Sequence, residues 1–403
     1  MNRHHLAAVL TGLLSLQTAS CDHIRPTTGP TIRDSTGVVV VDHGSLDLES
    51  LPQWHFEELP EVAIGVLDGD EAYQFFGVVD AHRRRDGSLA VIDRSRTIRV
   101  FDSVGAHMWT AGREGEGPGE FRWPQMVTEI RGDSLLVWDP AANRLTVFAP
   151  EGLLARTRTL QDFTGSDRSW GLSGPDRLLI GHRSAERALI EGHDSYTHHM
   201  ELLLVDLAGR VVDRLGRWFF AREFQEVDSR GAYSPAIFEA MAVIAPSSDG
   251  FWYGDTKSYE LRRVTAAAGI ERILKWQGPD QRITDSDVEA VLQVWGANPS
   301  ASPDLGPFLR EFGRTHPRAD QFPAYEEILT DAVGNLWIRD FVRGHTDDGF
   351  RRWTVFSPDG TQVLGRLTHS ERFQPLDVGE DWILGVETDA LDVERVVFHR
   401  IVG

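Results

Sequence analysis

Three carboxylates and one imidazole stand at related places in the chain, on segments that precede a recurring apolar run. If those segments line a common axis, the four side chains converge at the mouth of a channel. A hard cation such as Ca²⁺ takes about six to eight oxygen ligands, which carboxylates supply. A hydrated polar channel without a specific occupant is the alternative. The residues are Asp80, His82, Glu129 and Asp377.

A second group of possible metal ligands lies between Arg183 and Met200, a segment that is longer than its counterparts and that we expect to be a loop. Imidazole and carboxylate groups are close together here, as in many transition-metal sites. Because their spacing fixes no coordination geometry, an ordinary solvated loop is the alternative. The residues are His193, Asp194, His198 and His199.

Signatures of other chemistries are missing from the sequence. It has no nucleophile elbow, no phosphate-binding loop, no HExxH and no Cys/His zinc spacing. The glycines of GREGEGPGEF, residues 112–121, imitate a dinucleotide loop, but Pro118 and the following RWPQMV do not open a helix. The net charge of −20 argues against nucleic acid as a partner, since phosphates need a cationic surface.

The elements that must position these residues are repeats of about 45 residues, a period typical of propellers and solenoids. In each unit an apolar run ends in a polar residue, and a glycine ends the next strand in all units but the last. We interpret the polar residues as acceptors for backbone N–H groups in turns, with a ring of ligands as the alternative. The polar column is Asp93, Asp139, His182, Asp255, Asp340 and Glu387.

Six copies with room for four short strands each predict an all-β fold, a six-bladed β-propeller. The last unit supplies only about three strands, so we expect Glu61 to Val66 to close the ring as its outer strand. Between units four and five a helical insertion is expected at about 280–318. Ser286 and Glu289 there form a capping-box pattern, and an apolar face over 305–312 predicts a second helix. The helices either pack on the rim or roof one end of the channel.

The stretch from Asp86 to Pro124 resembles the NHL-repeat type of six-bladed β-propeller, through its paired strands and the crossing that follows them. It is most similar to a group of bacterial lipoproteins that carry a GEGPGEF crossing after the first blade. The resemblance covers about Gly37 to Gly403 and is strongest from Ile64 to Phe148. It implies the propeller fold and an extracytoplasmic location.

The N-terminus resembles a lipoprotein signal. Residues 1–20 combine a charged start, an apolar run and small residues before Cys21, which is the only cysteine and the expected site of lipidation. With Cys21 modified, the folded body has no thiol for a disulfide or a nucleophile. Residues 21–36 are rich in proline, glycine and hydroxyl groups and predict a flexible tether, so the propeller is expected over 37–403.

Two functions from different classes fit these observations. The first, which we favour, is a lipid-anchored module at the bacterial cell envelope that binds a protein, peptide or glycan as a monomer and contacts the membrane only through Cys21. The second is a propeller hydrolase or lyase, similar to lactonases, with a divalent metal such as Ca²⁺ at the channel mouth. The ligand sets of such enzymes cannot be matched here residue by residue, so an enzyme is not favoured.

Overall fold

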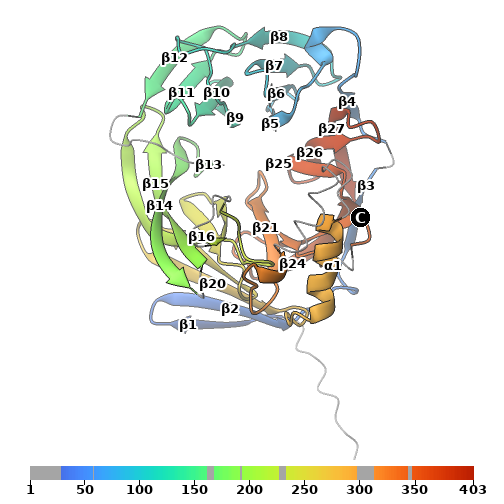
Figure 1. Cartoon of the computed structure of the whole chain (residues 1–403). Helices are drawn as coiled ribbons and strands as arrows, with labels where there is room; N and C mark the ends of the chain where they lie inside the picture. The colour runs from blue at the N-terminus through green and yellow to red at the C-terminus, as the bar shows by residue number, and fades with distance from the viewer. Residues whose placement is uncertain are drawn as a thin grey trace, which may run out of the picture.

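The computed structural model describes residues 29–57, 59–160, 168–190, 193–226, 233–296, 313–343 and 347–403. Most of them lie in antiparallel strands that follow one another along the chain and pair with their sequence neighbours. Figure 1 shows the sheets arranged in a ring, with the inner strand of each sheet toward the centre. Among the described residues, no helix is long and apolar enough to cross a membrane.

Each repeat forms an antiparallel meander, here called a sheet, that runs from the centre of the ring outward. The last meander has three strands of its own, and strands of the N-terminal segment join the last three meanders into a six-stranded and a nine-stranded sheet. The first two sheets contain β5 (Val78–Arg83), β6 (Leu89–Asp93), β7 (Ile98–Phe101) and β8 (His107–Ala111), then β9 (Met126–Ile130), β10 (Ser134–Asp139), β11 (Arg144–Phe148) and β12 (Leu154–Thr159). The next two contain β13 (Arg168–Leu172), β14 (Arg177–Ile190), β15 (His193–Asp206) and β16 (Val211–Glu226), then β17 (Val243–Pro246), β18 (Gly250–Gly254), β19 (Glu260–Thr265) and β20 (Gly269–Gln277).

The remaining strands form the last part of the ring and its N-terminal border. They are β21 (Tyr325–Thr330), β22 (Leu336–Asp340), β23 (Phe350–Phe356), β24 (Val363–Ser370), β25 (Phe373–Val378), β26 (Trp382–Thr388) and β27 (Glu394–Val402), with β1 (Thr31–Ser35), β2 (Val38–Ser45), β3 (Gln53–Phe56) and β4 (Val62–Ile64) from the N-terminal segment.

The hydrophobic core lies between neighbouring sheets, because the middle strands are covered on both faces. Strands β6, β7 and β11 are buried along their whole length, including their charged residues Asp93, Arg99 and Arg144, whereas the outer strand β8 alternates between exposed and half-buried residues. The crossing before β9 contributes to this core, since Phe121 is fully buried between the first two sheets. Gly112 has φ +83°, and a Cβ there would approach the Phe121 ring to 2.5 Å.

The N-terminal segment closes the ring, as predicted. Strand β4 pairs antiparallel with β27, with Val62 opposite Phe398 and Ile64 opposite Val396. The segment also reaches further than the sequence indicated. Strand β2 pairs in parallel with β20, and β3 pairs with both β24 and β27, so three outer edges are covered. A covered edge leaves no row of unpaired backbone groups open to another chain.

The expected tether is wrong in its last part. Residues 31–35 form strand β1, which pairs along its whole length with β2 and is exposed throughout. Its hydroxyl and charged side chains therefore reflect a solvated outermost strand that takes its order from the β2 backbone. The signal at 1–20 and Cys21 lie outside the described residues.

A long hairpin replaces the loop expected between Arg183 and Met200. Strand β14 runs on to Ile190 and β15 begins at His193, and their residues pair continuously from Arg177 with Asp206 to Ile190 with His193. Because β13 begins at Arg168, which lies opposite Gly181, the hairpin projects beyond the end of the ring where β13 starts. The segment lacks proline and has one glycine, Gly192, so nothing breaks the strands before their tip.

Helix α1 (Asp285–Gly296) lies between β20 and β21. Its N-terminus is capped by Thr284, whose hydroxyl and backbone N–H both bond the Asp287 carboxylate, so the capping box predicted at Ser286 and Glu289 is wrong by two residues. Val288 and Leu292 pack on Ile237, which precedes β17. The second predicted helix, at 305–312, falls outside the described residues.

Candidate functional site

The four side chains singled out at the channel mouth come from three neighbouring inner strands. Asp377 of β25 lies 2.9 Å from Nδ1 of His82 on β5, and the same oxygen accepts the Arg83 N–H at 2.9 Å. Asp80 of β5 accepts the N–H of Val127 on β9 at 2.8 Å, and Glu129 of β9 accepts the Arg85 N–H at 2.9 Å. Each carboxylate therefore joins the inner strand of one sheet to the backbone of the next.

The electrostatics of this cluster follow from burial and charge pairing. Burial raises the pKa of Asp80 to about 7, against the opposing effect of its bond from Val127. Burial disfavours the charged form of His82, but Asp377, Asp80 and Glu129 outweigh this effect and raise its pKa. The contact between Nδ1 of His82 and the Asp377 carboxylate, at 2.9 Å, lies at the centre of the cluster.

The channel-mouth cluster does not have the geometry of a Ca²⁺ site. Its carboxylate oxygens face backbone N–H groups and an imidazole, and Ca²⁺ would need several of them to converge on one point. Within the part of the chain that the structure describes, no group of three or more His, Cys, Asp or Glu residues could hold a metal ion. The geometry supports a role in fastening sheets together.

The histidine-rich group that was expected in a loop lies on strand β15 instead. Neighbouring residues on a strand point to opposite faces, which separates His198 from His199. His198 lies 2.9 Å from Glu223, whereas His199 Nδ1 lies 2.9 Å from the Arg217 guanidinium. Asp194 accepts hydrogen bonds from Arg187 at 2.8 and 3.0 Å, and His193 has its ring edge against His316.

A polar cavity with a volume of about 770 Å³ lies on the opposite side of the ring axis. It is lined by the inner strands β13, β17, β21 and β25 and by the residues that lead into them. Its lining carries charges of both signs, with Arg168 from β13, Glu326 and Glu327 from β21, Arg339 from β22, and the Arg351–Glu371 ion pair. The cavity therefore sits where the inner strands begin, at the end of the ring from which the β14–β15 hairpin projects.

The charges of this cavity are only partly paired with each other. Arg339 lies 3.2 Å from Glu326 and 3.0 Å from Glu327, and burial raises the pKa of Glu327. The Arg168 guanidinium lies over the Trp170 ring at 5.7 Å, and burial lowers its pKa. Within the described ranges, the Arg168 guanidinium has no hydrogen bond and no ion pair within 4 Å, which leaves its donors available to a ligand.

Sequence reasoning missed these cavity residues, although a signal for one of them exists. Glu327 precedes Asp340 by the same separation as Asp80 precedes Asp93, so the column that placed Asp80 also marks Glu327. Arg168 follows residues 161–167, where the third unit does not show the repeat. Its position has no counterpart by which the sequence alone could align it.

Antiparallel four-stranded sheets that follow one another around a ring define the class of β-propellers, and the chain is one of them. No family profile matches the chain, and no curated protein matches it.

Solved structures with a similar chain path include a Bacteroides fragilis protein at 10% identity, covering 87% of this chain and 99% of that one with a TM-score of 0.46. The PQQ-bound aldose sugar dehydrogenase of Streptomyces coelicolor has 12% identity, coverage of 88% and 100%, and a TM-score of 0.43. A virginiamycin B lyase of Staphylococcus aureus has 11% identity, coverage of 85% and 99%, and a TM-score of 0.39. The fold assignment rests on the strand pairing.

Proposed function

We propose that the protein is an extracytoplasmic interaction module that binds a protein, peptide or glycan at the end of the ring where the inner strands begin. The observation that carries this proposal is the cavity of about 770 Å³ at that end, with Arg168 lacking a hydrogen-bond partner among the described residues. Pockets with a few placed polar groups are the usual sites of recognition.

Two segments that are additional to the basic repeat support the assignment of the binding face to this end of the ring. The β14–β15 hairpin projects beyond the start of β13, and α1 packs on Ile237, which leads into β17. Extra segments that gather around one cavity are typical of a binding face on a repeated scaffold. The carboxylates that an enzyme with a channel-mouth metal would need are instead bonded to the backbone, so no observation favours that second function.

The proposal includes the finer features expected from the sequence. The scaffold is a six-bladed propeller of the NHL type with an insertion at about 280–318, and a lipid on Cys21 after removal of residues 1–20 holds it at the cell envelope as a monomer. In cells given a labelled fatty acid, the wild-type chain should incorporate the label and Cys21→Ser should not. Equal labelling of the two chains would contradict the anchor.

Site-directed photo-crosslinking in intact cells tests the binding face. A photoreactive residue in place of Met241, which lines the cavity and is 43% exposed, should give a discrete adduct. The matched control is Val104, in the turn between β7 and β8 at the other end of the ring and 79% exposed. Adducts from both positions, or from Val104 alone, would overturn the assignment of the face.

A further inference from the structure

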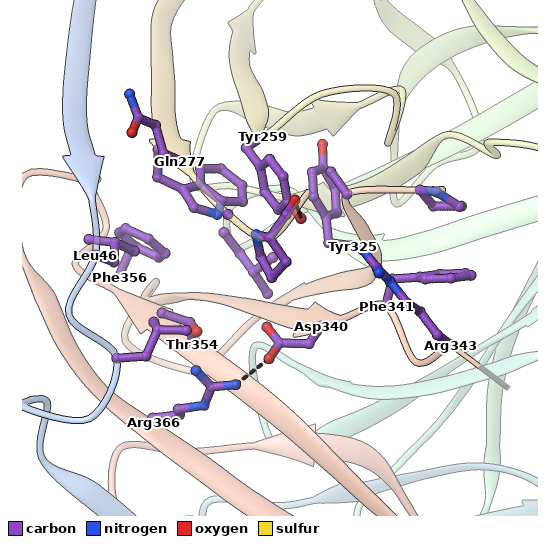
Figure 2. A pocket seen from close by; sticks show the side chains of 17 residues that line it. Leu46, Tyr259, Gln277, Tyr325, Asp340, Phe341, Arg343, Thr354, Phe356 and Arg366 are labelled. Atoms are coloured by element: carbon purple, nitrogen blue, oxygen red, sulfur yellow. Dashed lines mark hydrogen bonds and ion pairs between the residues drawn. The ribbon is translucent and has the colours of Figure 1, made fainter. Parts of the chain in front are cut away.

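A second, smaller cavity of about 170 Å³ lies between the β17–β20 sheet and the β21–β24 sheet. In Figure 2, the side chains of Tyr259, Tyr325 and Phe341 lie on one side of it, and those of Leu46 and Phe356 lie on the other. Trp276 completes this aromatic wall, with its ring 5.7 Å from Tyr259 and 5.6 Å from Tyr325. The walls are therefore apolar on most sides.

The polar group of this cavity is Asp340, which belongs to the repeated column of polar residues that close the second strand of each sheet. Asp93 and Asp139, its equivalents in the first two sheets, are almost fully buried and accept backbone N–H groups from the crossing before their sheet. Asp340 accepts no backbone N–H from the described residues and is bonded instead to Arg366, as the dashed line in Figure 2 marks. Asp340 therefore does not hold the backbone of a crossing, as Asp93 and Asp139 do.

The crossing into β21 explains why no backbone N–H of the described residues bonds the Asp340 carboxylate. Phe76 lies shortly before the inner strand β5, and its N–H donates to the Asp93 carboxylate. Pro323 lies at the same separation before the inner strand β21, but proline has no N–H to donate. The N–H of the next residue, Ala324, donates to the carbonyl of Thr256 at 2.7 Å. The crossing into this sheet therefore makes no use of Asp340.

The accessible part of Asp340 faces the cavity. Its side chain is 41% exposed, yet burial among the surrounding atoms raises its pKa. A carboxylate that faces an enclosed cavity is accessible to a small probe and is still partly desolvated by the surrounding atoms. Arg366 and Arg343 also line the cavity, so two guanidinium groups accompany one carboxylate. That balance disfavours a cationic ligand, and the Asp340 carboxylate disfavours an anionic one.

We propose that this cavity binds one neutral aromatic ring that carries a hydrogen-bond donor, such as an indole or a phenol. The ring packs against the aromatic wall, and its N–H or O–H donates to the Asp340 carboxylate. The size agrees, since a dry protein cavity of about 150 Å³ accommodates benzene. Edge-to-face contacts between aromatic rings add to the burial of apolar area.

Two sources could supply this chemistry, namely a free small molecule or a Trp or Tyr side chain of a partner. Only the second source rests on the interaction module proposed above. This cavity shares no lining residue with the cavity of about 770 Å³ that Met241 lines, so the two experiments can fail separately.

The test is calorimetric titration of the full chain with indole and with indene, which has nearly the same shape but no N–H. We expect indole to bind at least about 10-fold more tightly than indene, the ratio for one hydrogen bond to a charged group. In Asp340→Ala this preference should vanish. The matched control, Asp255→Ala, removes the column equivalent in the neighbouring sheet, which among the described residues accepts only the Lys257 N–H, and should keep the preference.

A third variant, Leu48→Trp, fills the cavity from a half-buried position of its lining and should weaken the binding of both probes. Thermal melts of each variant verify that the chain is folded. No binding of indole, equal binding of indole and indene, or an unchanged preference in Asp340→Ala would each overturn the proposal. Titration with a Gly-Trp-Gly peptide then separates the sources, because binding of the peptide assigns a partner side chain and binding of indole alone assigns a small molecule.

Discussion

The first two sheets and the two sheets across the ring are built from the same repeat, but they use its polar residues differently. On the β5–β12 side, Asp93 and Asp139 are 1% and 0% exposed and are bonded to backbone N–H groups, and Asp80 and Glu129 join one sheet to the next. On the β17–β24 side, Asp340 and Glu327 line cavities and are paired with arginines.

The difference shows where a repeated scaffold leaves room for binding. A polar residue that completes the backbone of a turn cannot be changed without cost, because a buried donor would lose its acceptor. Where a proline or a longer connection takes over that role, the same position becomes available to a ligand. We therefore expect stability to depend on the β5–β12 side and recognition on the β17–β24 side.

The largest expected effect is that of Asp139→Ala. Its carboxylate accepts N–H groups from Arg122, Trp123 and Ala142 at 2.7, 3.1 and 3.0 Å, and all three would lose their acceptor. We expect a loss of about 3 kcal/mol or more in the free energy of unfolding, measured with urea. Asp340→Ala, on the other side, removes the partner of one side chain and of no backbone N–H, and should cost less, about 1–2 kcal/mol. Equal losses would remove the contrast.

Asp377→Ala should have the next largest effect. It leaves the Arg83 N–H and the His82 ring without their partner, at a cost of about 1–3 kcal/mol in the free energy of unfolding. Its counterpart is Glu371→Ala, which breaks a 2.8 Å pair with Arg351 at a side chain that is 45% exposed. That change should cost less than about 1 kcal/mol. A Glu371→Ala loss as large as that of Asp377→Ala would contradict the comparison.

The pH dependence of stability should expose Asp80. Its folded pKa of about 7 lies above the ordinary aspartate pKa of 3.8, so the folded state holds a proton that the unfolded state releases. Stability from this group falls as pH rises from about 4 to about 7, by at most ~1.4 kcal/mol per pH unit. Asp80→Asn keeps an oxygen for the Val127 N–H and removes the slope.

Thermal melts of wild type and Asp80→Asn at pH 4.5 and pH 6.5 measure that slope. The melting temperature of the variant should fall less between the two pH values than that of wild type. Parallel pH profiles for the two proteins would show that Asp80 is ionised across this range.

The smallest effect is expected for Arg168→Ala, because its guanidinium has no ion pair or hydrogen bond within the described ranges. The free energy of unfolding should change by less than about 0.5 kcal/mol. Arg99 is the matched residue on the β5–β12 side, where its guanidinium contacts Asp93 at 3.2 Å and the Gln74 carbonyl at 2.9 Å. Arg99→Ala should cost about 2 kcal/mol, and the opposite order would contradict the contrast.

The sequence was a good guide wherever one residue determines local structure. The polar column located the ends of β6, β10 and β22, and the missing outer strand of the last sheet was found in β4. It was a poor guide where an element depends on a partner strand. Thr31 to Ser35 has no apolar pattern, and the β14–β15 extension looks like a polar loop, yet both are held by pairing with a neighbour.

The candidate sites divide in the same way. The four channel residues were correctly grouped because they occupy the inner strands, but the sequence does not show that backbone N–H groups use their oxygens. The aromatic cavity combines residues from 46 to 366, and only the folded ring brings them together. Asp340 itself was visible as a column member, although its release by Pro323 depends on the spatial path of the crossing.

The N-terminal strands also set an order of assembly. Strand β4 needs Val396 to Phe398, which are synthesised long after it, and β3 needs strands β24 and β27. Contacts between residues so distant in the chain form slowly, because the loop between them must be closed first. Folding can begin with the local meanders, but the ring is completed only after β27 has been made.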